Sequence, residues 1–174
     1  MQWYDVIFDL IDMRSFSNLW YWIVLAVMWS SVSHWVLGVP FDMIARARRH
    51  GGQAQADLEG MIRITTGRLL HIARTAGLAL VAILAFLLTG LVVLGFVYDV
   101  EFAQAVLFLL VPMLFVTALS LRAAVRIEAF ELAGAELDRL LTRHRIATQL
   151  IGMVSIFVTS LFGMWQNMHI GILG

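Results

Sequence analysis

Histidine is the residue type in this sequence best suited to chemistry, because imidazole titrates near neutral pH and binds metals. His34 falls in an apolar run, one to two turns before its end, and His71 and His144 stand just before two later apolar runs. Convergence of the three would allow haem or metal binding, or a proton path. No two histidines are four residues apart and no Glu-x-x-His motif occurs. We therefore expect no haem or metal site, and we expect His34 to form hydrogen bonds between helices.

Signatures of catalysis are absent from the sequence. It contains no phosphate-binding Walker loop, no dinucleotide fingerprint, no Gly-x-Ser-x-Gly and no His-Glu-x-x-His motif. The chain has no cysteine, which excludes disulfides, thiolate nucleophiles and cysteine-ligated clusters within it. We predict that the protein is not an enzyme.

Small and polar residues recur every four positions in two of the apolar runs. Residues with this spacing share one face of a helix. In lipid, small residues let helices approach closely, and hydroxyl groups bond across helices for about 0.6–2 kcal/mol each. The pattern predicts two packing faces, and the partner of the first is either the last helix or a different protein. The faces are Ala26, Ser30, His34 and Gly38 in the first run, and Ser155, Thr159 and Gly163 in the last.

The composition is that of an integral membrane protein. Hydrophobic residues make up 61% of the chain and charged residues 14%, whereas soluble domains average about 45–50% and about 25%. A membrane-spanning helix needs about 20 mostly apolar residues. We predict an all-α four-transmembrane-helix bundle in a single membrane domain at 17–168. Its predicted spans are 17–38, 76–98, 102–121 and 146–166.

Arginine placement predicts the orientation of these spans. The chain has 12 basic residues, all of them arginine: six lie in 41–75, five lie in 122–145, and the remaining one is Arg14. Basic residues concentrate on the cytoplasmic side of membrane proteins. We therefore predict a bacterial inner-membrane protein in which 41–75 and 122–145 are cytoplasmic and both termini lie on the periplasmic side.

The two cytoplasmic segments have the pattern of helices. Gly51-Gly52 is typical of a helix stop, and Gly134 is placed to end one helix and begin its return. We favour helices that extend beyond the bilayer as two hairpins. The alternative is that both segments lie flat on the membrane as basic amphipathic helices.

The N-terminal stretch 1–16 predicts a helix of another kind. Trp3 and Ile7 fall on one face, and Asp5 and Asp9 fall on the other. A short helix with one aromatic, apolar face and one acidic face suits the outer membrane interface. We expect 1–16 to lie there.

The densest basic cluster is Ala-Arg-Ala-Arg-Arg-His at 45–50. Anionic lipid contributes about 1 kcal/mol of attraction per basic residue near the surface. We predict that Arg46, Arg48 and Arg49 contact lipid phosphate. Docking of an acidic partner or of RNA is the alternative, but the positive excess on this side is modest, so we expect no nucleic-acid partner.

Two segments carry a resemblance to a known group of proteins: DMRSFSNLWYWI at 12–23 and SHWVLGVPFDMIARARR at 33–49. They resemble small alphaproteobacterial membrane proteins that are often labelled "component of SufBCD complex". The resemblance is densest over the first fifty residues. It implies a link to iron–sulfur cluster assembly, in which a chain without cysteines would anchor or dock other components.

The leading functional hypothesis is an accessory subunit, assembly factor or scaffold of a larger membrane complex. Its expected partners are membrane lipids and either that complex or further copies of the chain. The alternative is a small transporter, a channel or a b-type cytochrome that uses His34 and a third span broken at Pro112. An enzyme acting on lipids is a third, more distant possibility.

Overall fold

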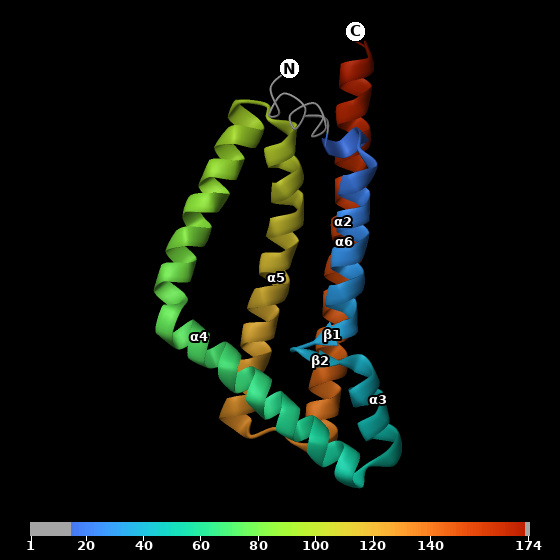
Figure 1. Ribbon diagram of the computed structural model, residues 1–174, viewed down its shortest axis with the longest axis vertical. Helices are drawn as coiled ribbons and strands as arrows, with labels where there is room; N and C mark the ends of the chain where they lie inside the picture. The colour runs from blue at the N-terminus through green and yellow to red at the C-terminus, as the bar shows by residue number, and fades with distance from the viewer. Residues whose placement is uncertain (1–14, 173–174) are drawn as a thin grey trace, which may run out of the picture.

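The computed structural model of the chain describes residues 15–172, with side chains as far as Met168. Long helices joined by short turns make up the molecule (Figure 1). Within the described residues, three helical segments are long and apolar enough to cross a membrane: Gly52–Val97, Glu101–Phe130 and Gly134–Met168. The elements in chain order are η1 (Ser15–Ser17), α2 (Leu19–His34), β1 (Trp35–Val36), β2 (Val39–Pro40), α3 (Phe41–His50), α4 (Gly52–Val92), the π-helix η2 (Val93–Val97), α5 (Glu101–Phe130) and α6 (Gly134–Ile172).

The first predicted span is shorter in the structure than in the prediction. Helix α2 has 16 residues, which at 1.5 Å per residue extend about 24 Å, whereas the hydrocarbon core of a bilayer is about 30 Å thick. Asn18 caps its first turn by accepting a hydrogen bond from the backbone N–H of Trp20. Residues 1–14, which hold most of the predicted interfacial helix, lie outside the described residues.

Helix α2 ends because the chain turns back on itself after His34. Strands β1 and β2 pair antiparallel, and Leu37 and Gly38 form the two-residue turn between them. Both turn residues have positive φ, 52° and 78°, as a type I′ hairpin requires. The prediction that the first helix continues to Gly38 is therefore wrong.

Helix α4 begins at the predicted Gly-Gly stop. Gly51 and Gly52 have φ of 57° and 50°, a region that favours glycine, so α3 ends there and the chain reverses direction. Helix α4 then crosses the molecule obliquely and bends to run along the bundle (Figure 1). Its first half buries residues one turn apart, whereas the apolar window of its second half is only 6% buried within the chain. The buried residues are Leu58, Ile62, Thr66 and Leu70.

The predicted tight hairpin between the second and third apolar runs is confirmed. The π-helix η2 and a short turn at Asp99, which has φ 53°, connect α4 to α5. Gln104 Nε2 donates to the carbonyl oxygen of Gly95 at 2.6 Å. A Cβ atom at Gly95 would lie 3.2 Å from the Gln104 backbone nitrogen, so glycine allows this close approach.

Helix α5 continues without interruption past Pro112. The predicted break of the third span at this residue is therefore absent. At the start of α5, the carboxylate of Glu101 is buried, and its Oε1 accepts the backbone N–H of Phe16 at 2.6 Å. This hydrogen bond ties η1 to α5. The C-terminal part of α6 lies at the same end of the bundle (Figure 1).

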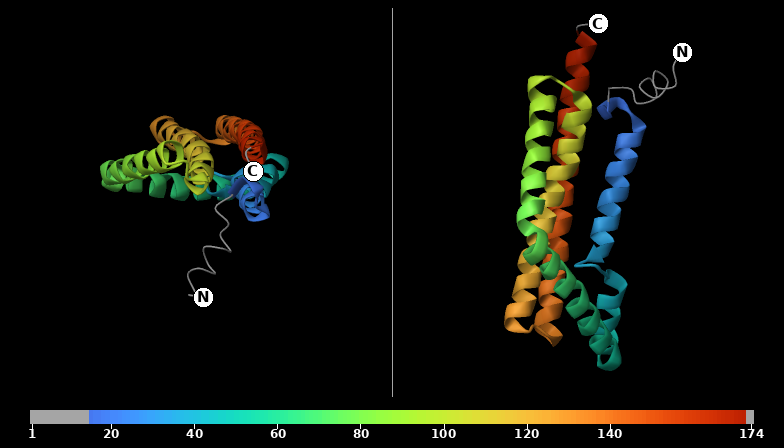
Figure 2. Two further views of the ribbon diagram at one scale, coloured as in Figure 1. Left: turned by 90° about the horizontal axis from the view of Figure 1, so that it is seen from above. Right: turned by 60° about the vertical axis from the view of Figure 1, so that its left-hand side comes forward.

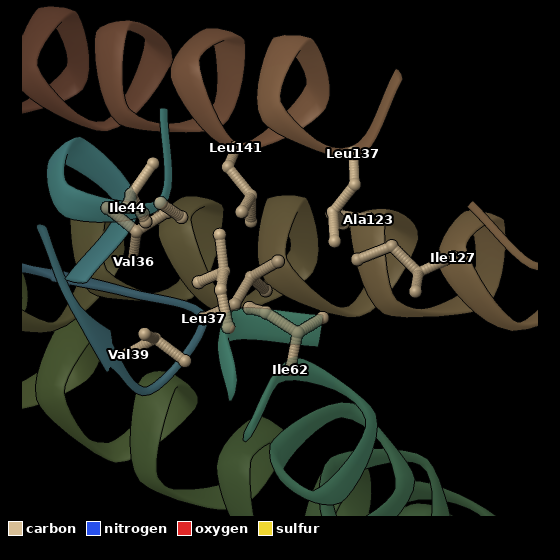
Figure 3. Close-up of a cluster of buried hydrophobic side chains, with 11 residues drawn as sticks. Val36, Leu37, Val39, Ile44, Ile62, Ala123, Ile127, Leu137 and Leu141 are labelled. Carbon is tan, nitrogen blue, oxygen red and sulfur yellow. The ribbon is translucent and has the colours of Figure 1, made fainter. Parts of the chain in front are cut away.

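The opposite end of the bundle forms a compact base with the largest apolar core. Gly134, with φ 54°, begins the return helix as predicted. The predicted segments 41–75 and 122–145 are helical, turn back at Gly51-Gly52 and at Gly134, and pack together here, and Figure 3 shows their side chains converging. The core consists of Val36, Leu37, Val39, Ile44, Ala47, Leu58, Ile62, Ala123, Ile127, Leu137 and Leu141.

Polar contacts hold the edges of this base. Glu59 Oε1 on α4 accepts the backbone N–H of Gly134 at 2.8 Å, which places a carboxylate at the N-terminus of α6, where a helix favours negative charge. This N–H donor, followed by the side chain of Gln55, lowers the pKa of the Glu59 carboxyl. The guanidinium of Arg145 lies 3.4 Å from the centre of the Phe41 ring, and this contact joins α6 to α3.

Candidate functional site

The predicted small and polar face of α6 lies inside the molecule. Ser155, Thr159 and Gly163 are all buried. A Cβ atom at Gly163 would lie 3.3 Å from Phe16 Cβ, and Thr159 lies beside Tyr21. Small residues on α6 therefore give space to aromatic residues of η1 and α2.

The predicted small and polar face of α2 does not meet α6. The buried residues of α2 are Tyr21, Leu25 and Trp29, whereas Ala26 and Ser30 are exposed. Rings as large as these bury more apolar area than serine or alanine, so the aromatic face takes the interior position. The prediction that this face packs against the last helix of the same chain is therefore wrong. The alternative, that it packs against a different protein, stays a prediction.

The three candidate histidines differ in their surroundings. His34 is the last residue of α2 and is exposed, with its ring edge-to-face against Trp35. His71 is exposed on α4, and His144 is buried on α6. Within residues 15–168, no three His, Cys, Asp or Glu side chains stand close enough to hold a metal ion. The prediction that His34 lies one to two turns inside a helix is wrong, because α2 ends at that residue.

His144 takes part in the best-defined polar contact between α5 and α6. Ser120 Oγ donates to the carbonyl oxygen of Val116 at 2.9 Å, and His144 Nε2 lies 3.0 Å from the same Oγ. Because a hydroxyl has one proton, Nε2 is the donor in this arrangement. Nδ1 is then a buried acceptor that has no hydrogen-bond partner within the described chain. His144 also borders a cavity of about 360 Å³ beside Trp35 and Gly38 of the hairpin.

The predicted lipid-contacting arginines lie on the outside of α3. Arg46, Arg48 and Arg49 are all exposed. Arg49 Nε donates to the carbonyl oxygen of Ala45 at 3.2 Å, one turn earlier in the same helix. All three side chains are open to a ligand from outside the chain.

A second basic site was missed in the sequence analysis. Arg122 and Arg126 on α5, with Arg139 and Arg143 on α6, border one cavity of 620 Å³ that also contains Glu136. Each pair is four residues apart, and the short turn before Gly134 brings the two helices together. Spacing of arginines on both sides of a predicted helix return is the signal that would have found this site.

The opposite side of the base is acidic. A cavity of 520 Å³ between α4 and α5 is bordered by Glu59, Glu128 and Glu131, with Arg63 as its basic residue. Glu128 also forms a bidentate ion pair with Arg74. The base therefore presents negative charge near α4 and positive charge along the outer side of α5 and α6.

Comparison with known proteins adds no relative to this description. No family model, no curated protein and no solved structure matches the chain.

Proposed function

We propose that the chain is a four-span protein of the bacterial inner membrane that acts as a non-enzymatic accessory or assembly subunit of a larger membrane complex. In this proposal α2 crosses the membrane in addition to the three longer helices. The base is cytoplasmic, and both termini are periplasmic. The distribution of arginine supports this orientation, because 11 of the 12 arginines fall in 41–75 and 122–145.

The observation that carries the proposal is the exposed polar face of α2. This helix is strongly apolar, yet Ala26, Ser30 and Ser31 are exposed while Tyr21 and Trp29 are buried. In lipid, hydroxyl groups are better placed against another helix, and small residues give an incoming helix room to approach. We infer that this face contacts a helix of a partner subunit.

The second half of α4 supports the membrane placement. Leu78, Val81 and Phe86 are 88%, 63% and 78% exposed, and α4 meets the rest of the bundle mainly through the base and the hairpin to α5. So much outward apolar surface suits contact with the lipid hydrocarbon layer. The resemblance noted above makes an iron–sulfur assembly complex one candidate partner for the α2 face.

The alternative functions have less support in the geometry. A transporter, channel or cytochrome would need His34 inside the span, whereas this side chain lies at the exposed end of α2. Pro112, the second residue of that hypothesis, lies within an uninterrupted helix. No observation in the described residues favours these functions over subunit docking.

Site-specific photo-crosslinking in the native membrane tests the proposal. A benzophenone side chain at Ser30 is expected to crosslink to one discrete membrane protein. The same group at Leu78, on the exposed face of α4, serves as the control for random collision. If both positions give the same weak set of products, the α2 face is not a docking face.

A further inference from the structure

Two cavities follow one another along the seam between α5 and α6, and together they form what is called the groove here. Its lower part is the basic cavity of 620 Å³, and its upper part is an apolar cavity of 530 Å³, in which Ser155 is the single polar residue among the described lining residues. The lining residues of α5 follow one another by about one helical turn: Val111, Phe115, Leu119, Arg122 and Arg126. Those of α6 do the same in the opposite direction: Arg139, Arg143, Ala147, Leu150 and Val154.

This groove faces away from the rest of the described chain. Seen from above (Figure 2, left), α5 and α6 occupy one side of the molecule, and α2 and the lower half of α4 occupy the other. Arg122, Arg126, Arg139 and Arg143 are all exposed. Arg74 and Glu128 form the single ion pair within residues 15–168, so the four groove arginines have no carboxylate partner there.

The positive charge of the lower cavity favours binding of an anion. Four guanidinium groups and one carboxylate, that of Glu136, give it a formal excess of positive charge. Guanidinium groups bind phosphate oxygens with paired hydrogen bonds. Arginines on two adjacent helices can therefore hold one phosphate from two sides, which a single row on α3 cannot do.

The apolar cavity indicates that the anion bound at the arginines carries a hydrocarbon chain. It is the next cavity along the same pair of helices, since Phe115 and Leu119 are one turn apart on α5 and line the apolar and the basic cavity respectively. From Arg126 to Leu107 the groove extends over 19 residues of helix, about 28 Å at 1.5 Å per residue. One leaflet of a bilayer contributes about 15 Å of hydrocarbon. The groove is long enough for a charged head and an acyl chain end to end.

We propose that this groove binds an anionic phospholipid, with its phosphate held by Arg122, Arg126, Arg139 and Arg143 and one acyl chain lying on the apolar cavity. The inference rests on the membrane placement proposed above, but it is independent of any partner subunit. In that placement the arginines lie at the cytoplasmic interface, where such headgroups are found, and the apolar cavity lies within the hydrocarbon layer.

Native mass spectrometry of the purified full-length chain in a neutral detergent tests the proposal. The chain is titrated with dioleoyl phosphatidylglycerol, dioleoyl phosphatidylcholine or inorganic phosphate. We expect one phosphatidylglycerol to bind at least about tenfold more tightly than phosphatidylcholine. Each arginine beside the headgroup contributes about fivefold, so R122Q/R126Q is expected to weaken binding about thirtyfold. R63Q/R68Q removes the same charge from the exposed side of α4. This variant is expected to bind phosphatidylglycerol within about twofold of the wild-type affinity.

A second pair of variants tests the acyl chain. V154W fills the apolar cavity, and V81W adds the same bulk to α4 at a valine of similar exposure, 63% against 61%. Each methylene group that is displaced costs about fourfold in affinity, so V154W is expected to weaken binding about tenfold while V81W has no effect.

Several results would overturn the proposal. Equal binding of the two lipids, or an equal loss in R63Q/R68Q, would show that the groove arginines have no special role. Displacement of lipid by inorganic phosphate, with V154W inert, would indicate a site for a free anion. If no lipid binds, the lipid proposal is wrong, and an acidic protein segment becomes the candidate ligand of the groove. Because no partner is present in the experiment, each result stands whether or not the accessory-subunit proposal holds.

Discussion

Trp29 of α2 packs directly on Gly152 of α6, so closely that a Cβ atom at position 152 would lie 2.8 Å from Cε3 of the indole ring. Real Cβ atoms do not come this close to ring carbons, so the contact depends on glycine. It fixes how near the two helices lie and turns the aromatic face of α2 inward. The polar face with Ser30 is thereby turned outward.

We predict that Gly152→Ala separates α2 from α6 and destabilises the chain by about 1–3 kcal/mol, the usual cost of overpacking, relative to Gly90→Ala. No atom of the described residues lies within 4 Å of a Cβ atom at Gly90, so that control carries the same gain in helix propensity without the clash. Thermal unfolding in mild detergent measures the difference. Trp29→Phe in the Gly152→Ala background should restore part of the loss. Equal stability of the two alanine variants would contradict the packing described for α2 and α6.

The hydrogen bond from the Gly134 N–H to Glu59 predicts a dependence of stability on pH. It lowers the pKa of the Glu59 carboxyl in the folded chain below the unfolded value of 4.5. A lowered folded-state pKa gives stability that is complete above about pH 5 and is lost as the pH falls through the lowered value. Since Glu59 is near the surface, the contribution is below about 1 kcal/mol.

Glu59→Gln tests this relationship. At pH 7 the variant should unfold at a slightly lower temperature than the wild-type chain, and the difference should disappear as the pH falls through the lowered pKa of the Glu59 carboxyl. Glu131→Gln, at a carboxylate that accepts no hydrogen bond within the described residues, should leave the transition unchanged at both pH values. An undiminished difference at low pH would show that the carboxylate does not stabilise the N-terminus of α6.

The sequence predicted the long helices well because their signals are local. Gly51-Gly52, the hairpin around Asp99 and the return at Gly134 were all correctly placed, since helix ends depend on nearby residues that tolerate positive φ. The end of α2 was placed four residues too late, because the hairpin at Leu37 and Gly38 lies in an unbroken apolar run.

The orientation of each helix about its own axis was harder to predict. Both faces of α2 are compatible with a membrane helix, and the choice between them depends on the contact of Trp29 with Gly152, 123 residues later in the chain. The basic groove was missed for the same reason, because it forms only where α5 and α6 meet. Segments 41–75 and 122–145 were predicted as helices, but their packing into one base depends on tertiary contacts.

The length of α2 leads to a prediction about topology. It extends about 24 Å, and we predict that it crosses the membrane with Ser17 and Gln53 on opposite sides. The chain has no cysteine, and a single introduced thiol can therefore be labelled without background. Ser17→Cys, just before α2, should react with a membrane-impermeant maleimide in spheroplasts. Gln53→Cys, in the base, should react only after lysis. Labelling of both residues only after lysis would show that α2 does not cross.

Copurification from the native membrane tests the central claim most directly. The chain is extracted in mild detergent and run on a native gel, and the proteins that migrate with it are identified by mass spectrometry. Ser30→Phe is compared with Leu78→Phe, which adds the same ring to an exposed position on α4. We predict that wild type and Leu78→Phe migrate with a stoichiometric set of larger subunits and that Ser30→Phe, folded and inserted, migrates without them. Wild-type chain that migrates alone, or only with copies of itself, would contradict the proposed accessory role.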